Sequence, residues 1–340
     1  MRKTAFFLAA AAAALCTVAC NKDFSGKAGE ENISDEQRVE VPVFITGAKS
    51  IVTKSSDADF DDDHSEVANI QFFAFNSDNE LEVYKKITSG LGTTLSLRYG
   101  SNAVYAVVNA PDITGVSTKA GLLAVTSSLT DNANHFVMLG YVNLNIPDDF
   151  QGGYDGRISV YRLASRVVVK KVTADFTNPA YAAASCNLVR MFLVNAVGDG
   201  NLGRTAAPSV WYAKQGFESV SGIADFLSTS GGNHDLNTAP FETACYHYCY
   251  PNPTTTDTSS ATWSPRHTRI VIEVQLAGDT FYYPITLPEL EFGKSYEIEN
   301  LTSTRKGSTN PDTPVEIYTA TYNINVKPWT VVPVTSGVTI

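Results

Sequence analysis

The sequence predicts an all-β protein built from two antiparallel β-sandwich domains in tandem. Beyond residue 38, almost every periodic stretch alternates apolar and polar residues, which is the period of a strand with one buried face. These stretches are short and end at Gly, Asn, Asp or Pro, which favour turns. The 340 residues include 23 Gly and 15 Pro but only 18% charged residues, as in a β-rich globular protein rather than a disordered one.

The first domain is predicted to span residues 38–158. Its first strand runs from Val39 to Ile45, where aliphatic residues at odd positions alternate with Arg38, Glu40 and Pro42 at even positions. A short helix is predicted at residues 119–129. The remaining predicted strands, each bounded by turn residues, are 68–76, 81–87, 93–98 and 103–109.

The second domain is predicted to span residues 159–340, with the boundary near residues 156–162. The long segment 198–262 is rich in Gly, Ser, Thr and Asn, and it is predicted to form surface loops. The predicted strands of this domain are 166–176, 187–195, 268–276, 280–287 and 296–302.

The N-terminus has the pattern of an export signal. Arg2 and Lys3 precede an apolar run from Ala5 to Leu15, which is too short to cross a bilayer that needs roughly 20 residues. Small residues then lead to Cys20, so residues 1–19 are predicted to be a lipoprotein signal peptide and Cys20 the acylated first residue of the mature chain. Thr stands three residues before this Cys, where Leu is usual, and a plain secretory signal that ends near residue 19 is the alternative.

Residues 20–37 are polar and are predicted to form a flexible tether. No later segment is long and apolar enough to cross a membrane, so we expect attachment by lipid alone. The net charge of the chain is −10, and without residues 1–19 it has 23 basic and 35 acidic residues. This balance argues against a nucleic-acid-binding protein, because binding to phosphates needs a basic face.

Residues from Tyr318 onward show an unusually long alternation. A typical strand has about 5–6 residues, whereas here the pattern extends over about twenty, with polar odd positions as far as Lys327. Pro328 and Pro333 lack amide donors, which suits a strand at the edge of a sheet. The apolar side chains at even positions are Tyr318, Ala320, Tyr322, Ile324, Val326, Val332, Val334, Val338 and Ile340.

This pattern has two interpretations. One is two ordinary strands of the second domain, broken at Pro328. The other is a donor strand, residues 317–340, which completes the sheet of a neighbouring subunit by β-strand addition. Trp329 lies on the face opposite the even-numbered row, so we expect it to pack against its own second domain.

Several ordered motifs, spread over nearly the whole chain, resemble those of FimA-type fimbrillins, the type V pilin family of Bacteroidales. Each motif is weak by itself, and the order and spacing carry the resemblance. The motifs are Ala-Cys-Asn-Lys-Asp at 19–23, Val-Ala-Asn-Ile-Gln-Phe-Phe-Ala-Phe-Asn at 67–76, Tyr-Ala-Val-Val-Asn-Ala at 105–110, Arg-Leu-Ala-Ser-Arg-Val-Val-Val at 162–169, Lys-Ser-Tyr-Glu-Ile at 294–298, Asn-Pro-Asp-Thr-Pro at 310–314 and Ile-Asn-Val-Lys-Pro-Trp at 324–329.

The resemblance implies two transthyretin-like β-sandwich domains and a structural role in a fimbrium at the cell surface, where it would mediate adhesion. It implies export as a lipoprotein to the outer membrane, followed by proteolytic removal of the N-terminal segment with its first strand. The C-terminal strand of the next subunit would then fill the opened groove. The implied partners are other pilin subunits, in a homopolymer with anchor and tip subunits, and a processing protease. By correspondence, the removed strand is 39–45 and the donor strand begins at Tyr318.

The expected cleavage site departs from the family pattern. Shaft subunits of the family are typically cut after an Arg behind the first strand, whereas here Arg38 precedes that strand and the next arginine is Arg98. Lys54 and Lys49 are the candidate processing sites, with Lys54 the better positional match. An uncut anchor or accessory lipoprotein is the first alternative, and a carbohydrate-binding surface lipoprotein is the second.

Cys245, His247 and Cys249 lie close together in the sequence. In a strand, residues four apart are about 13 Å apart, beyond the ~6.8 Å limit between the Cα atoms of a disulfide. A turn would allow a Cys245–Cys249 disulfide, and export favours oxidation. Free buried thiols are the alternative. A metal site would need Cys186 or His234 as a fourth ligand, and none is predicted.

No motif points to catalysis or to a cofactor. The sequence lacks a Gly-x-Ser-x-Gly elbow, a His-Glu-x-x-His motif, a phosphate-binding loop and a dinucleotide fingerprint, so we expect no enzyme and no cofactor. The acidic loop at 57–63 lacks the Gly and Glu of a calcium loop and is predicted to be solvated. A group of aromatic residues indicates a sugar- or protein-binding surface or, as we favour, internal packing: Trp211, Tyr212, Tyr246, Tyr248, Tyr250 and Trp263.

Overall fold

The computed structural model describes residues 38–46, 49–50, 66–150, 152–154, 156–257, 262–314 and 319–329. The predicted signal peptide and tether therefore lie outside the described residues, as do Cys20, Lys54, Tyr318, Val332 and Val334. Lys49 is described only as part of strand β2 (Lys49–Ser50), which pairs with β3 (Glu66–Val67).

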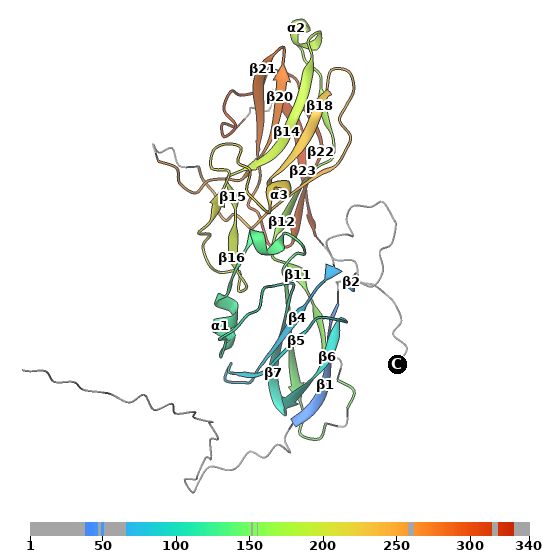
Figure 1. Ribbon diagram of the computed structural model, residues 1–340, viewed down its shortest axis with the longest axis vertical. Coiled ribbons are helices and arrows are strands. Elements are labelled where there is room, and N and C mark those ends of the chain that lie inside the picture. Colours follow the sequence, from blue (N-terminus) through green and yellow to red (C-terminus); the bar gives the residue numbers. More distant parts are fainter. Residues whose placement is uncertain are drawn as a thin grey trace, which may run out of the picture. The chain divides into compact units, whose positions relative to one another are not determined.

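Two sheets that share one apolar core are built from residues 38–162 (Figure 1). A three-stranded sheet has the order β10-β1-β6, and a five-stranded sheet has the order β11-β9-β7-β4-β5. Val41 and Leu97 from the first sheet meet Phe72 and Ala106 from the second in the core. The strands are β1 (Arg38–Thr46), β4 (Ile70–Phe75), β5 (Leu81–Ile87), β6 (Gly92–Arg98), β7 (Gly100–Val108), β9 (Met138–Ile146), β10 (Gly156–Ser159) and β11 (Tyr161–Arg162).

Two further sheets are built from residues beyond 164. One has the order β13-β22-β12-β19 with β23 also paired to β22, and the other has the order β18-β14-β20-β21. Val167 and Ile298 of the first sheet pack with Ile270 and Tyr283 of the second. The strands are β12 (Ser165–Val169), β13 (Val172–Ala174), β14 (Cys186–Val194), β18 (Ser228–Asp235), β19 (Cys245–Cys249), β20 (Arg269–Leu276), β21 (Asp279–Thr286), β22 (Lys294–Ser303) and β23 (Ala320–Pro328).

The short elements lie between these strands. The helix expected at 119–129 ends early, as α1 (Lys119–Ala124), because the chain next pairs as β8 (Thr126–Ser128) with β16 (Asp199–Asn201). Thr118 caps α1 by accepting a hydrogen bond from the Gly121 amide. The other short elements are the 3-10 helix η2 (Leu129–Asn132), α2 (Pro179–Ala182), α3 (Ala224–Leu227), β15 (Ala196–Val197) and β17 (Trp211–Tyr212).

A buried ionic network holds the Asn-Pro-Asp-Thr-Pro loop in place. The Asp312 carboxylate accepts hydrogen bonds from Arg266 at 2.7 Å, from Arg269 at 2.5 Å and from the Asn195 amide at 2.7 Å. Arg269 also forms an ion pair with Asp257. Removing one partner from such a set would leave a buried charge unpaired, so the network fixes this loop between β22 and β23.

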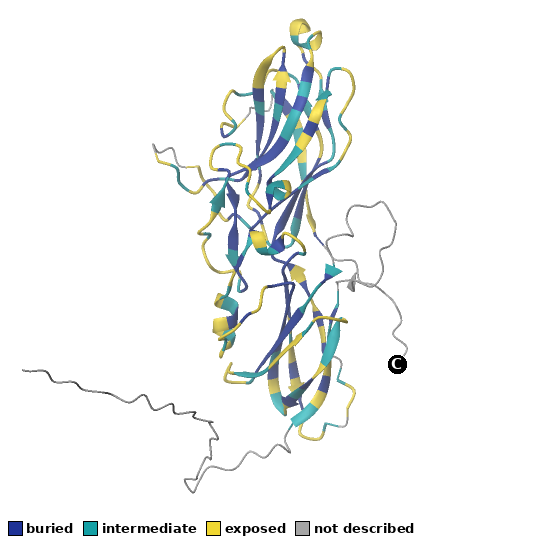
Figure 2. Ribbon diagram, in the orientation of Figure 1, coloured by how far each residue is buried: buried dark blue, intermediate teal, exposed yellow. Residues whose placement is uncertain are grey.

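The predicted all-β fold with two antiparallel β-sandwiches is confirmed, and Figure 2 shows buried positions concentrated along the strands. Among the described strands, parallel pairing occurs between β1 and β10, β2 and β3, β12 and β22, and β13 and β22. The division of the chain at residues 158 and 159 stays a prediction. β10 and β11 pair with strands of the first two sheets, and β12 is the first strand of the second pair of sheets.

Candidate functional site

β1 lies in the middle of its sheet and buries every second side chain. Val41, Val43 and Ile45 are 0%, 1% and 2% exposed, whereas Glu40 and Pro42 are exposed. Because successive side chains of a strand point to opposite faces, one face of β1 belongs to the core and the other points outward. At about 1.5–3 kcal/mol for each buried aliphatic side chain, these three contribute roughly 5–9 kcal/mol of hydrophobic stabilisation.

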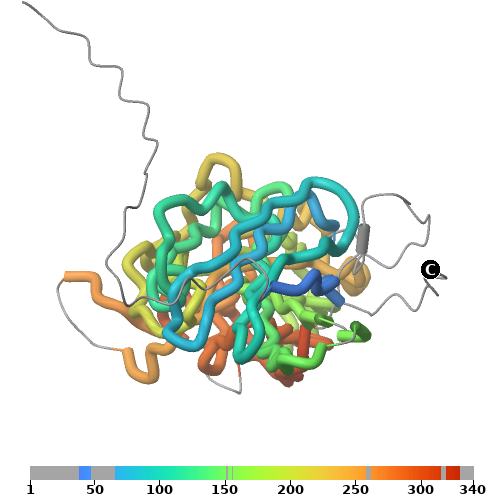
Figure 3. The backbone as a smooth tube through the Cα atoms, turned by 90° about the horizontal axis from the view of Figure 1, so that it is seen from below, coloured from blue at the N-terminus to red at the C-terminus, as the bar shows by residue number. Residues whose placement is uncertain are grey.

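The backbone of β1, the dark-blue segment in Figure 3, is paired on both sides. It forms seven antiparallel register pairs with β6 and four parallel register pairs with β10. Loss of β1 would therefore leave two facing strand edges with unpaired N–H and C=O groups, which is a template for another strand.

Two glycines let the neighbouring strands approach β1 closely. A Cβ atom at Gly92 would lie 2.5 Å from the Cβ of Phe44, and one at Gly156 would lie 2.7 Å from the Cγ1 of Val43. Real Cβ atoms do not come so close, so these two positions exclude any side chain while β1 is in place. The space that β1 fills between β6 and β10, called the slot from here on, is thus fitted closely to residues 43 and 44.

The floor of the slot is apolar. Leu95 and Leu97 of β6 and Ile158 of β10 belong to the same buried cluster as the inward side chains of β1. Without β1, this cluster would be exposed as a trough, and a large exposed apolar patch favours a protein partner. The facing sheet adds the buried side chains Ile70, Phe72, Ala74, Val104, Ala106, Val108, Met138, Leu144 and Ile146 to the cluster.

The predicted donor segment begins with a strand that belongs to its own sheet. β23 forms eight antiparallel register pairs with β22. Ala320 is fully buried, and Tyr322 and Ile324 pack against the core between the two sheets built from residues beyond 164, whereas Val326 is 49% exposed. Among the described strands, β23 pairs with β22 alone, so it is an edge strand, as its prolines predict.

Ion pairs on the outer face also hold β23 against β22. Lys327 lies 2.7 Å and Lys170 lies 2.9 Å from the same oxygen of Glu297, and Asn325 donates to Glu299 at 3.3 Å. Burial acts to raise the pKa of Glu297, but hydrogen bonds from Lys170 and Lys327 outweigh it and lower the pKa below its ordinary value. Glu297 therefore stays ionised and joins the two strands at neutral pH.

Trp329 anchors the chain where β23 ends. Its side chain is only 4% exposed and lies in a cluster with Phe136, Ala164 and Tyr248. The Arg162 guanidinium lies 4.3 Å from the centroid of the indole, and the Trp329 amide donates to the Gly293 carbonyl at 2.8 Å. Trp329 thus packs against Ala164 and Tyr248 of the predicted second domain, as expected, and also against Phe136 of the predicted first domain.

Comparison with known proteins places this arrangement among fimbrial structures. No protein-family model and no curated protein matches the sequence. A fimbrillin (FimA) of known structure from Porphyromonas gingivalis is 15% identical, with a TM-score of 0.61 over 88% of this chain and 99% of that one. The chain has the fimbrillin fold. The resemblance expected from the sequence motifs is thereby confirmed at the level of fold.

Two other solved structures share the fimbrillin fold. A candidate cell adhesion protein from Bacteroides eggerthii is 19% identical, with a TM-score of 0.60 over 86% of this chain and 97% of that one. The tip fimbrial protein Mfa3 from Porphyromonas gingivalis is 13% identical, with a TM-score of 0.50 over 86% of this chain and 100% of that one.

Of the two interpretations of Cys245 and Cys249, a disulfide or free buried thiols, the structure has the second. Both residues lie in the regular strand β19, and they and Cys186 are buried free cysteines. An extended strand holds residues four apart beyond the reach of a disulfide. Burial raises the pKa of the Cys245 thiol to about 11 and of the Cys249 thiol to about 12, so both stay protonated and unreactive.

His247, between these cysteines, is a structural residue. It is fully buried, and the hydrogen-bond distance between its Nε2 and the Met191 carbonyl is 3.3 Å. Burial lowers the pKa of His247 to about 4. No group of three His, Cys, Asp or Glu side chains among the described residues is placed to hold a metal ion.

We predict that His247 makes the fold sensitive to acid. The unfolded chain takes up a proton near the ordinary pKa of 6.5, whereas the folded protein does so only near pH 4. The unfolded state binds more protons between these values, so stability falls as the pH decreases, by about 3 kcal/mol in total. Denaturant unfolding at pH 7 and pH 4.5 should show a smaller loss in His247→Gln, and an equal loss in both proteins would contradict the prediction.

The aromatic group in the second half of the chain is mostly internal. Tyr248 and Tyr250 are buried, and Tyr250 donates a hydrogen bond to Ser127 at 2.7 Å. Trp211 and Trp263 contact each other edge to face, with ring centroids 5.4 Å apart. These contacts support internal packing for the group, the interpretation favoured from the sequence.

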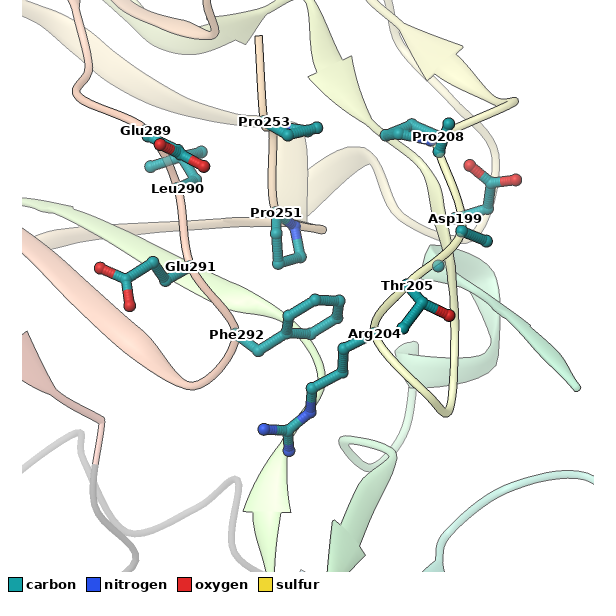
Figure 4. A pocket seen from close by; sticks show the side chains of 13 residues that line it. Asp199, Arg204, Thr205, Pro208, Pro251, Pro253, Glu289, Leu290, Glu291 and Phe292 are labelled. Atoms are coloured by element: carbon teal, nitrogen blue, oxygen red, sulfur yellow. The ribbon is translucent and has the colours of Figure 1, made fainter. Parts of the chain in front are cut away.

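A shallow hollow of about 540 Å³ lies among three loops at residues 199–208, 251–253 and 289–292 (Figure 4). Arg204 lies over the Phe292 ring, with its guanidinium carbon 5.3 Å from the ring centroid. The Asp199 carboxylate is held by the amides of Ser209 and Val210 at 2.9 Å each. The carboxylate is thus used within the loop, and the lining brings together no nucleophile and base.

The part of the chain that the structure describes includes no helix of the length and apolar character that a membrane crossing requires.

Proposed function

We propose that this protein is a structural subunit of a cell-surface fimbrium and that subunits join by donor-strand exchange. The observation that carries the proposal is β1. It is a central strand with a fully buried face, and its removal would leave an apolar slot between β6 and β10. The two strand edges left by β1 could pair with another strand that has the same alternation of apolar and polar residues.

The shared fold supports this function. The similar structures include a fimbrillin and a tip fimbrial protein, both from Porphyromonas gingivalis. We infer the same class of role for this chain, at the cell surface and in contact with other pilin subunits, including anchor and tip subunits. Adhesion is then a property of the polymer, and no catalytic step is required.

In the proposed sequence of events, Cys20 is acylated and holds the precursor at the outer membrane. A protease then cuts after Lys54 or Lys49, and the segment that contains β1 leaves. The slot between β6 and β10 is filled by the tail of the next subunit, and the product is a homopolymer.

We place the donated segment at residues 330–340, after Trp329. Ala320, Tyr322 and Ile324 of the expected donor row fill the core of their own domain, so donating β23 would empty that core. Val332 and Val334 continue the same even-numbered row beyond the anchor at Trp329. With Val338 and Ile340, they are the part of this row whose donation would leave the contacts of β23 and Trp329 in place.

A chain that stops after Trp329 tests the proposal. We expect loss of filaments in electron micrographs and of polymer ladders that resist SDS, because the donated strand is missing. Export and the unfolding midpoint should not change, since β23 and Trp329 keep their contacts. A matched control replaces residues 330–340 with a Gly-Ser segment of the same length. Filaments in the truncated chain would refute the proposal.

The N-terminus of the same surface material decides between this proposal and a second candidate, an uncut anchor or accessory lipoprotein. That candidate is favoured by the absence of arginine between Arg38 and Arg98, and by the burial and two-sided pairing of β1. Intact mass should show a start after Lys54 without lipid for a polymerising subunit. A start at acylated Cys20 would replace the first candidate by the second.

A further inference from the structure

A three-residue motif of β1 occurs again in the donated segment. β1 contains Val41-Pro42-Val43, and residues 332–334 are Val-Pro-Val. In β1 the two valines are 0% and 1% exposed and the proline between them is exposed on the outer face. The motif therefore carries two inward aliphatic side chains and one outward residue that cannot donate a backbone hydrogen bond.

The slot accepts a proline at position 42 for a local reason. The Ile45 amide donates to Leu91 at the end of β6, so odd-numbered residues of β1 direct their backbone groups to β6. Even-numbered residues direct theirs to β10, as the bond from the Val160 amide to the Thr46 carbonyl shows. β10 begins opposite Val43, so an amide at position 42 lies before the start of that ladder. A proline costs no ladder hydrogen bond there.

The same geometry excludes the neighbouring registers. With Val-Pro-Val 332–334 aligned on residues 41–43, a shift of two residues toward the C-terminal end of β1 would put Pro333 in the place of Phe44. Phe44 pairs with Arg157 of β10, and a proline there would lose a ladder hydrogen bond. If the entering strand moved back by two, Ser336 would take the place of Val43, where the slot is closed around a valine by Gly156. A strand in the opposite direction would convert the seven-pair antiparallel ladder with β6 into a parallel one.

We infer that residues 330–340 of a second copy of this chain enter the slot in the direction of β1, with Val332, Pro333 and Val334 in the places of Val41, Pro42 and Val43. This register rests on the proposed function. Thr330 then takes the place of Val39, which is only partly buried. Ser336 takes the place of Ile45, which is buried at the end of the cluster, so this register puts one hydroxyl there and keeps valines at the positions of Val41 and Val43.

Cysteine cross-linking tests this register. In the inferred register Val331 takes the place of Glu40, which lies opposite Ser96 of β6. Their backbone groups point away from each other, and such pairs in an antiparallel ladder have Cα atoms about 4.5 Å apart, within disulfide range. We therefore expect the double variant Val331→Cys, Ser96→Cys to form ladders that survive boiling in SDS and disappear with reductant.

Two control variants keep Val331→Cys and move the second cysteine. Thr94→Cys reports the forward register, and Arg98→Cys reports the backward register. Each control should cross-link on the order of ten-fold less than the Ser96 variant, because the Cα separation exceeds the disulfide range. The described native cysteines are buried and will not compete.

Each outcome decides the inference. Linkage through Ser96 supports it. Filaments that link best through a control position overturn the register while the proposed function stands. A reducible bond within a single chain overturns the assignment to a second copy. Absence of filaments and of any cross-link, in chains that are exported normally, overturns both the inference and the proposed function.

Discussion

Replacement of Val334 by Asp is expected to abolish polymerisation. In the inferred register this side chain takes the place of Val43, which is 1% exposed in a cluster of aliphatic and aromatic side chains. An unpaired carboxylate there costs several kcal/mol, and each 1.4 kcal/mol lowers an equilibrium constant tenfold. We expect the yield of SDS-resistant ladders to fall about 100-fold or more, as measured on cells with unchanged amounts of exported protein.

Thr335→Asp is the matched control for this variant. It adds the same charge one residue further along, at a position that takes the place of Phe44 on the outer face of the strand. Water remains available to the carboxylate there, so the ladder yield should stay within about twofold of the wild type. Equal loss in both variants would show that charge in the tail, rather than burial in the slot, blocks assembly.

Trp329→Ala is expected to destabilise the isolated subunit by about 3–5 kcal/mol, because it removes a buried aromatic side chain and leaves a cavity. The Arg162 guanidinium would also lose the indole face that lies 4.3 Å from it. The free energy of unfolding from guanidinium titration measures this effect. The polymer should assemble from the variant with reduced stability, since the donated residues themselves are intact.

Trp329→Phe provides the comparison for this effect. It keeps an aromatic ring against Phe136 and Tyr248, whose ring centroids lie 4.9 Å and 5.5 Å from the indole. We therefore expect the free energy of unfolding to fall by less than about half as much as in Trp329→Ala. A change below about 0.5 kcal/mol in Trp329→Ala would mean that the tryptophan does not anchor the chain.

Local patterns in the sequence were sufficient to predict the strands that matter most for the proposed assembly. The alternation in 39–45 predicted a strand with one buried face, and Val41, Val43 and Ile45 are that face. The alternation from Tyr318 onward likewise predicted the opposite orientation of Trp329, and the prolines of that segment predicted an edge strand. In the first segment the apolar residues at odd positions are the buried ones, so its pattern can be read without knowing the partner strand. In the second segment the row holds as far as Ile324, whereas Val326 is 49% exposed.

Other features depend on contacts that local patterns do not reveal. β9 was missed because Gly140 interrupts its alternation, yet a Cβ atom there would lie 2.3 Å from the Ser159 carbonyl oxygen. β18 was missed because Ser-Thr-Ser-Gly-Gly-Asn-His-Asp has almost no apolar residue, and it is a strand through its pairing with β14. β19 lies in the segment 198–262 that was predicted to form surface loops, because the abundance of Gly, Ser, Thr and Asn there does not reveal its pairing with β12.

The environment of Trp329 could not be predicted for the same reason. Phe136, Arg162 and Tyr248 come from three segments that are far apart in the sequence, and only the fold brings them to one indole. The Val-Pro-Val motif, in contrast, was present in the sequence from the start. Its role could not be inferred from the sequence, because only the pairing of β1 shows why a proline is accepted at position 42.

The pairing of β23 with β22 has a mechanical consequence for a filament. A pull along the axis of β23 from its C-terminal end would load all eight register pairs with β22 together, in shear. Peeling the strand from its end, one hydrogen bond at a time, would first require extraction of Trp329 from its cluster. In the proposed filament, tension would therefore load this strand pair in the geometry that resists rupture best, and each subunit would transmit the pull without unravelling.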